Sequence, residues 1–384
     1  MKKNIQFFIK QRFAFLLMCL ILSAGCIGIL FSVTGAPSSP VWLSNESISG
    51  IEDTQTISAR GVFGSTKENV TLVYPGGMPF GVKIFADGLI VSGFTDVDVL
   101  AGSKSPAYDA GLRTGDILKS INSTPIVSTK DLTDAVAACE GREITLDYER
   151  GGKMHTAQFT PAYSASESKY KTGMWVKDST SGIGTVTYIV PETNEFGGLG
   201  HGICDGDTGN LVKMTRGYLT GATITGAVKG LAGSPGELKG YFGSVKNGAV
   251  VKNTSNGIFG IMTSLPTNLT EGPLEIGSKK EITEGEAYIW STVGDEGPQK
   301  FSIEISNIDR DCTDGKCFSV RITDESLIAV TGGIVQGMSG SPIVQNGKLV
   351  GAVTHVLIND PTSGYGIFIE NMLNAAEMPM AKAS

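Results

Sequence analysis

The chain has 384 residues, of which 41% are hydrophobic and 18% charged, a composition that excludes wholesale disorder and leaves room for two domains. Glycine accounts for 51 of the 384 residues, or 13%, against an average of about 7%. This excess favours a β-rich fold with many tight turns. The net charge of −7 argues against a general nucleic-acid binder.

The N-terminal region is basic and then apolar. Residues 13–33 carry no charge. Four basic side chains precede them: Lys2, Lys3, Lys10 and Arg12. No acidic residue precedes Glu46. A helix of this length reaches the roughly 30 Å of a hydrocarbon core. We therefore predict a cytoplasmic flank and membrane anchor over 1–35, with the rest of the chain outside the cytoplasm. A cleaved signal peptide is the alternative, and lipidation at Cys26 is a weaker one.

Residues 36–70 are rich in Ser, Thr, Gly and Asn and are predicted to be a linker. Residues 71–165 follow as a small α/β module with short strands, a helix starting near Thr129 and a hairpin at Gly151-Gly152. The order of these strands and helices resembles that of a PDZ domain. The resemblance rests on Pro79-Phe80-Gly81-Val82, in the place of the carboxylate-binding loop, and on the run Ala110–Leu118. A PDZ domain binds an extended peptide or C-terminus as an added strand.

Residues 166–384 have a different pattern, with strand-like runs separated by glycine-rich turns and a helical stretch only near the end. Many short strands with regular turns predict a β-barrel or sandwich. We therefore expect a mixed chain: a membrane anchor, a small α/β PDZ domain, and then a mostly-β domain.

The motif Gly337-Met-Ser339-Gly340-Ser-Pro342 precedes a hairpin with an Asn-Gly turn. A serine nucleophile needs access to a carbonyl and backbone N–H groups that converge on the oxyanion. The N–H groups of Gly337 and Ser339 are placed to serve as those donors, as in Gly-x-Ser-Gly-x-Pro of trypsin-like peptidases. Ser341 is the alternative nucleophile, and an incidental serine in a glycine-rich turn is the alternative to catalysis.

A serine nucleophile needs a base, and the chain has three histidines. His155 lies in the PDZ-like module, and His355 at the end of a strand is expected to be structural. His201 lies between glycines in the same domain as Ser339, so we predict that it is the general base. For the third catalytic member we favour Asp324, because Asp205 and Asp207 are too near His201 in sequence for the usual triad geometry.

Four cysteines lie outside the apolar segment, and Cys312 and Cys317 enclose an Asp-Gly turn. A disulfide between them is compatible with an oxidising compartment. Zinc is a weaker idea because the chain has no second close cysteine pair and its histidines are scattered. We predict no metal and no cofactor.

Together, the anchor, the PDZ-like module, Gly-Leu-Gly-His-Gly around His201 and Gly-Met-Ser-Gly-Ser-Pro around Ser339 resemble the stage IV sporulation protein B family. The run Gly332–Pro342, the tripeptide Thr354–Val356 and the segment Asn359–Gly366 add to the resemblance. The resemblance implies a chymotrypsin-like double β-barrel serine endopeptidase. The family's histidine, serine and aspartate correspond to His201, Ser339 and Asp324, although fifteen residues between the last two is a short spacing.

The resemblance also implies a role. Such a peptidase is exported into the space between the forespore membranes, cleaves itself, and then cuts a membrane-bound inhibitor so that the late mother-cell sigma factor is processed. Its partners would be protein substrates, including itself and that regulatory protein, and peptides in the PDZ groove. The alternatives are a non-catalytic, membrane-tethered PDZ scaffold and an envelope quality-control PDZ protease.

Overall fold

The computed structural model describes residues 72–100, 102–267 and 269–377. The predicted anchor over 1–35 and the linker over 36–70 lie outside these residues. None of the helices in the described ranges has the length and apolar character needed to cross a bilayer.

Six strands close into a first β-barrel, in the order β2-β13-β14-β15-β12-β11 and back to β2, with every neighbouring pair antiparallel. Alternate side chains such as Val82, Ile84 and Phe196 fill its interior and are nearly inaccessible to solvent. The strands are β2 (Pro79–Phe94), β11 (Met174–Ile189), β12 (Glu195–Gly198), β13 (Met214–Val228), β14 (Glu237–Thr254) and β15 (Gly257–Met262).

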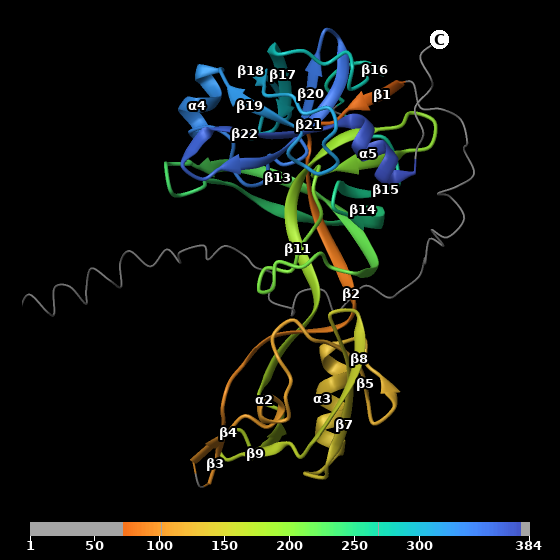
Figure 1. Ribbon diagram of the computed structural model, residues 1–384, viewed down its shortest axis with the longest axis vertical. Helices are drawn as coiled ribbons and strands as arrows, with labels where there is room; N and C mark the ends of the chain where they lie inside the picture. Colours follow the sequence, from red (N-terminus) through yellow and green to blue (C-terminus); the bar gives the residue numbers. More distant parts are fainter. Residues whose placement is uncertain (1–71, 101, 268, 378–384) are drawn as a thin grey trace, which may run out of the picture. The chain divides into compact units, whose positions relative to one another are not determined.

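Another six strands close a second barrel in the order β17-β18-β19-β22-β21-β20, again with antiparallel neighbours. They are β17 (Gly285–Ser291), β18 (Gln299–Ser306), β19 (Phe318–Ile322), β20 (Pro342–Gln345), β21 (Lys348–Leu357) and β22 (Asp360–Phe368). β1 (Leu72–Pro75) and β16 (Leu274–Ile276) connect the barrels, and α4 (Glu325–Thr331) and α5 (Ile369–Ala376) belong to the second. The strand pairing agrees with the predicted double β-barrel (Figure 1).

The PDZ module has its own apolar core, built around Leu89, Leu118, Leu132, Val136 and Ile144. Its helix α3 (Thr129–Ala138) begins with a capping box between Ser128 and Asp131. The remaining elements are β3 (Val97–Val99), β4 (Gly102–Lys104), α2 (Pro106–Asp109), β5 (Ile117–Ile121), β6 (Thr124–Pro125), β7 (Ile144–Arg150), β8 (Lys153–Phe159), β9 (Ala162–Ser164) and β10 (Lys169–Lys171).

The domain boundaries differ from those predicted, because β2 and β11 belong to both domains (Figure 1). The first part of β2 pairs with β11 and β13 in the first barrel, whereas Leu89 and Val91 further along β2 lie in the PDZ core. The barrel fold therefore includes β1 and β2 as well as the strands after residue 166, and the PDZ domain is inserted between two neighbouring barrel strands. Sequence patterns missed this because one uninterrupted strand serves two cores.

The segment Pro79-Phe80-Gly81-Val82 is correspondingly not a carboxylate-binding loop. Phe80 and Val82 are buried among the side chains inside the first barrel. Gly81 pairs with Ile183 on β11 and with Thr220 on β13, so both edges of the strand are occupied. A peptide cannot be added to a strand whose two edges are already paired.

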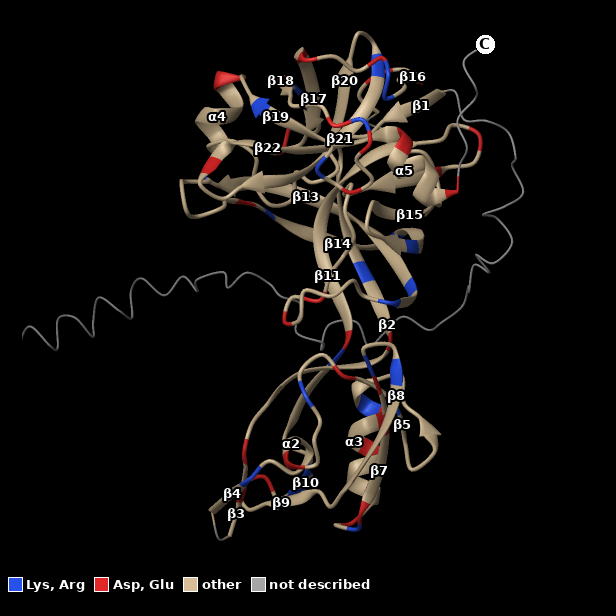
Figure 2. Ribbon diagram, in the orientation of Figure 1, with Lys and Arg blue, Asp and Glu red and all other residues tan. Residues whose placement is uncertain are grey.

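Acidic and basic side chains are interspersed along the strands and helices of the described residues (Figure 2). Nucleic-acid binding usually needs clustered lysines and arginines on one face.

Candidate active site

His201 lies on the loop that follows β12 of the first barrel. Gly200 precedes it with a φ of +68°, and a Cβ there would lie 2.8 Å from the Thr354 side chain, so the loop can pass this close to β21 only with glycine. The Nδ1 atom of His201 is 2.9 Å from the carbonyl oxygen of Gly202. Because a carbonyl only accepts, Nδ1 carries the proton and Nε2 keeps the lone pair that a general base needs.

Ser339 lies on the loop that leads into β20 of the second barrel. Gly340 has a φ of +96°, and a Cβ there would lie 2.1 Å from the carbonyl oxygen of Thr185 on β11. Only glycine allows the loop to approach the first barrel this closely. The Oγ of Ser339 donates a 2.7 Å hydrogen bond to the carbonyl oxygen of Thr354 at the end of β21.

The backbone N–H groups of Gly337 and Ser339 have no hydrogen-bond partner within the described residues. Gly337 has a φ of +100°, a conformation that favours glycine. Neighbouring amides are all engaged: Gln336, Met338, Gly340 and Ser341 each donate to a backbone carbonyl. Two unpaired donors beside one serine are the arrangement that an oxyanion hole requires.

The structure brings His201 and Ser339 to the same end of β21. The ring centroids of His201 and His355 are 5.2 Å apart, and His355 follows Thr354, the residue that Ser339 contacts. No hydrogen bond joins the Ser339 hydroxyl to His201 in the described part of the chain, because that hydroxyl points to Thr354 instead. The histidine thus comes from the first barrel and the serine from the second.

Both imidazoles favour the neutral form. Burial lowers the pKa of His201, and the hydrogen bond to the Gly202 carbonyl opposes this only in part. Burial, and then the neighbouring ring of His201, lower the pKa of His355 to about 4. A neutral His201 is the form that can accept a proton from serine.

No hydrogen bond or ion pair joins Asp324 to His201 within the described residues. Asp324 is the N-cap of α4, and its carboxylate accepts hydrogen bonds from the backbone N–H groups of Ser326 and Leu327 and, at 3.3 Å, from that of Ser302. These donors lower the pKa of Asp324 against the opposing effect of burial. In this structure Asp324 therefore serves as a helix cap, and its predicted catalytic role stays a prediction.

Four further residues considered for catalysis are engaged elsewhere. Ser341 is fully buried; its hydroxyl donates to the Met338 carbonyl and lies 3.0 Å from the Ser291 hydroxyl, from which it can accept. His155 stacks on Tyr148 in the PDZ domain. Asp205 pairs with Lys177 and accepts hydrogen bonds from its own loop, and Asp207 also pairs with Lys177.

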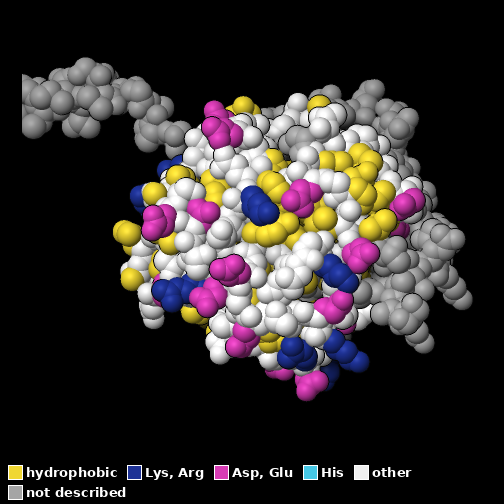
Figure 3. Space-filling model, turned by 90° about the horizontal axis from the view of Figure 1, so that it is seen from above, with side chains coloured by type: hydrophobic (Ala, Val, Ile, Leu, Met, Phe, Trp, Pro, Cys, Tyr) yellow, Lys and Arg dark blue, Asp and Glu magenta, His cyan; other side chains and the backbone are white. Residues whose placement is uncertain are grey.

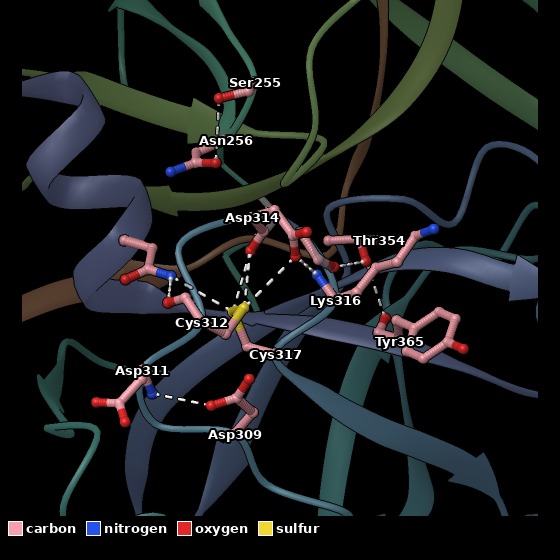
Figure 4. The surroundings of a disulfide bond; sticks show 12 residues. Ser255, Asn256, Asp309, Asp311, Cys312, Asp314, Lys316, Cys317, Thr354 and Tyr365 are labelled. Carbon is pink, nitrogen blue, oxygen red and sulfur yellow. Dashed lines mark hydrogen bonds between the residues drawn. A yellow bond between two sulfur atoms is a disulfide. The ribbon is translucent and has the colours of Figure 1, made fainter.

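Cys312 and Cys317 form a disulfide, as the Asp-Gly spacing suggested (Figure 4). The loop that it closes contacts the site, because the Thr354 hydroxyl donates to the Gly315 carbonyl at 2.5 Å. The Asp314 carboxylate and the two sulfur atoms lie within 4.8 Å of one another. Metals bind cysteine as the thiolate, and here the disulfide engages both sulfur atoms.

The chain matches two protein-family models. Residues 168–373 match the model described as SpoIVB peptidase S55, which is more than half of the chain. The chain belongs to the SpoIVB peptidase S55 family. Residues 99–150 match a PDZ domain model, so the SpoIVB-family chain combines a domain of this peptidase family with a PDZ domain.

Individual relatives are more distant. The putative zinc metalloprotease NMA0084 of Neisseria meningitidis is 33% identical over 116 residues, covering 30% of this chain and 23% of that protein. The zinc metalloprotease RasP of Shouchella clausii is 40% identical over 55 residues, covering 14% of this chain and 13% of that protein. This SpoIVB-family chain therefore spans less than a quarter of the length of these curated relatives.

Among solved structures, the active form of the Rv3671c protease from M. tuberculosis has a TM-score of 0.30 and 15% identity, covering 53% of this chain and 76% of that chain. The PDZ domain of the SdrC-like protein from Listeria monocytogenes has a TM-score of 0.20 and 18% identity, covering 23% of this chain and 87% of that chain.

Proposed function

We propose that this serine peptidase is an endopeptidase in which Ser339 is the nucleophile, His201 the general base, and the N–H groups of Gly337 and Ser339 the oxyanion hole. The observation that carries the proposal is the pair of unpaired amides beside a serine that shares one end of β21 with an imidazole from the other barrel. Ser339 is held against β11 by backbone contacts that only Gly340 permits.

The reaction follows from these positions. Ser339 Oγ turns from the Thr354 carbonyl to His201 Nε2, which takes its proton as oxygen attacks the scissile carbonyl. The two amides bind the oxyanion that forms. His201 then gives the proton to the leaving amine, and a water molecule, deprotonated by the same imidazole, releases the acyl group.

The Gly202 carbonyl does part of the work usually assigned to an aspartate. It accepts from Nδ1 of His201, which fixes the tautomer and partly stabilises the imidazolium that forms during the reaction. A neutral carbonyl stabilises that cation less than a carboxylate would. We therefore expect a moderately fast enzyme, suited to a few specific cleavages rather than to bulk digestion.

We place the peptide groove of the PDZ domain along β11, in place of the excluded segment of β2. Met174 and Val176 pack against the PDZ core that includes Leu132 and Val136 of α3. At these positions β11 pairs only with β2 among the described strands. Its other edge can therefore accept an extended peptide or C-terminus beside the helix.

The proposed substrates are proteins: the chain itself and a membrane-bound regulatory protein whose cleavage triggers processing of the late mother-cell sigma factor in sporulation. In Figure 3, apolar side chains gather on one face with charges of both signs around them. Apolar surface with a mixed polar rim suits protein contacts. The proposed location, outside the cytoplasm behind an N-terminal anchor, is supported by the disulfide.

The test uses a fluorophosphonate probe on the purified full-length chain. We expect labelling of the wild type, and its loss in both Ser339→Ala and His201→Ala. Ser341→Ala is the matched control, because it removes a neighbouring, fully buried hydroxyl while the Ser341 N–H still donates to the Met338 carbonyl, and it should still label. Labelling that is indifferent to Ser339 and His201 would refute the assignment. Cleavage of the regulatory protein in sporulating cells tests the proposed role.

A further inference from the structure

Two buried threonines of the first barrel contact the loop that carries the nucleophile. Thr185 and Thr187 lie on β11 with 1% and 0% of their surface exposed. The Thr185 hydroxyl donates to the Gly337 carbonyl at 2.8 Å, and the Thr187 hydroxyl donates to the Gly340 carbonyl at 2.8 Å. The backbone N–H of Thr185 adds a third bond, to the Ser339 carbonyl at 3.0 Å.

These bonds complete a set in which every carbonyl of the loop is engaged. The Gln336 carbonyl accepts from Leu238 N–H, and the Met338 carbonyl accepts from Ser341. With the three bonds to β11, all five consecutive carbonyls from 336 to 340 have donors. In a trans peptide the N–H points opposite to the C=O of the preceding residue, so the donors to the Gln336 and Met338 carbonyls fix the direction of the two unpaired amides. The bonds from Thr185 and Thr187 hold the peptide planes that flank them.

The hydroxyl groups, rather than the side-chain shape, are the informative feature. Valine has nearly the same shape as threonine and is common in buried strands, so packing alone does not call for an oxygen at either position. A buried hydroxyl without a partner is costly, and both hydroxyls find their acceptors in the nucleophile loop. Gly337 and Gly340 have positive φ values and no side chain to anchor them, so the loop depends on such external bonds.

We propose that Thr185 and Thr187 are positioning residues that hold the peptide planes flanking the two oxyanion-hole amides, and so keep those amides in their catalytic orientation. The proposal rests on the proposed function of the Gly337 and Ser339 amides. Without the Thr185 hydroxyl, the Gly337–Met338 peptide between the two amides keeps only the bond from Met338 N–H to the Val335 carbonyl. The loop then spends less time with both amides directed at the oxyanion.

The experiment compares Thr185→Val and Thr187→Val with Thr185→Ser and Thr187→Ser in the full-length protein. The readouts are the rate of fluorophosphonate labelling and the thermal unfolding midpoint. We expect the valine variants to label at least ~10-fold more slowly, because loss of one oxyanion donor costs about 10²–10³, whereas the serine variants stay within a few-fold of the wild type. Thr292→Val is the matched control, since Thr292 is equally buried and its hydroxyl donates to the Gly77 carbonyl.

A second readout separates positioning from mere stability. A peptide aldehyde, whose adduct places an oxyanion in the hole, should bind the valine variants more weakly, whereas binding of an uncleaved peptide to Ser339→Ala carrying the same change should be unaltered. Valine variants that label and bind the aldehyde like the wild type would overturn the proposal. If the valine variant at one position fails to fold, the comparison of valine with serine at the other position tests the proposal. Failure of the proposed function is distinguishable, because the wild type itself would then not label through Ser339.

Discussion

The hydroxyl of Ser339 donates a 2.7 Å hydrogen bond to the carbonyl oxygen of Thr354, one residue before His355. Thr354 lies beyond the part of β21 that pairs with β20, so this carbonyl faces the site rather than a neighbouring strand. The nucleophile therefore rests on an acceptor that a bound peptide can use for its own N–H.

This contact predicts that substrates with a backbone N–H just before the scissile carbonyl react faster than those without one. Such an N–H would replace the serine on Thr354 and free the hydroxyl for His201. Methylation of that nitrogen in a peptide ester should lower kcat/KM by ~10-fold, about the value of one hydrogen bond in a desolvated site. Methylation of the backbone nitrogen one residue further from the scissile bond is the control. An equal loss of kcat/KM for both methylated substrates would count against this role of Thr354.

The pH dependence of activity should be displaced to the acid side. Burial lowers the pKa of His201 below 6.5, so the base stays neutral as the pH falls through 6.5 and is protonated only at lower pH. The acid limb of kcat/KM should therefore lie below 6.5. His355→Gln should leave the position of this limb unchanged. A limb at or above 6.5 would show that the base is not this buried imidazole.

The free energy of unfolding should also depend on pH through the same two histidines, and it should decrease as the pH falls. In the unfolded chain they bind protons near pH 6.5, whereas in the folded chain His355 binds one only near pH 4. The free energy of unfolding contributed by these groups should therefore decrease as the pH falls from about 6.5 to 4. Urea titrations at several pH values measure this, and His355→Gln should flatten the slope in that window.

Substitutions at Asp324 separate its role as a helix cap from a catalytic role. Asparagine is as good an N-cap as aspartate, so Asp324→Asn should retain activity within a few-fold, whereas a triad aspartate replaced in this way loses about 10⁴ in kcat. Asp324→Ala should cost about 1 kcal/mol of unfolding free energy. Denaturant unfolding and labelling rates of the two variants measure these outcomes, and a near-inactive Asp324→Asn would restore the triad.

Loss of the disulfide should destabilise the second barrel. A cross-link that closes so short a loop contributes about 2 kcal/mol by loop-closure entropy, and Cys317 is fully buried. The double variant Cys312→Ser, Cys317→Ser should therefore unfold at a lower temperature and label more slowly, because Gly315 contacts Thr354. Dithiothreitol should lower the wild-type midpoint to that of the variant. A wild type insensitive to reductant would argue that the bridge does not form in solution.

The sequence was most informative where function is local. Glycines around His201 and Ser339 are required by positive φ values and close approaches, so their spacing was visible in the chain itself. The role of Asp324 stays a prediction, because a helix cap and a triad aspartate look alike in sequence; in the structure its carboxylate caps α4. Thr185 and Thr187 carried no signal, because their partners lie more than 150 positions away and in the other barrel.

Insertion of the PDZ domain between β2 and β11 has a consequence for how the chain reaches its native state. Phe85 and Ser179, neighbours across these strands, are 94 positions apart, and joining them through a random coil would carry the full entropy of closing so long a loop. A PDZ domain that folds first, as soon as it is synthesised, brings the two ends together in register. It would then act as an internal nucleus for barrel assembly, in addition to any role in recognising peptides.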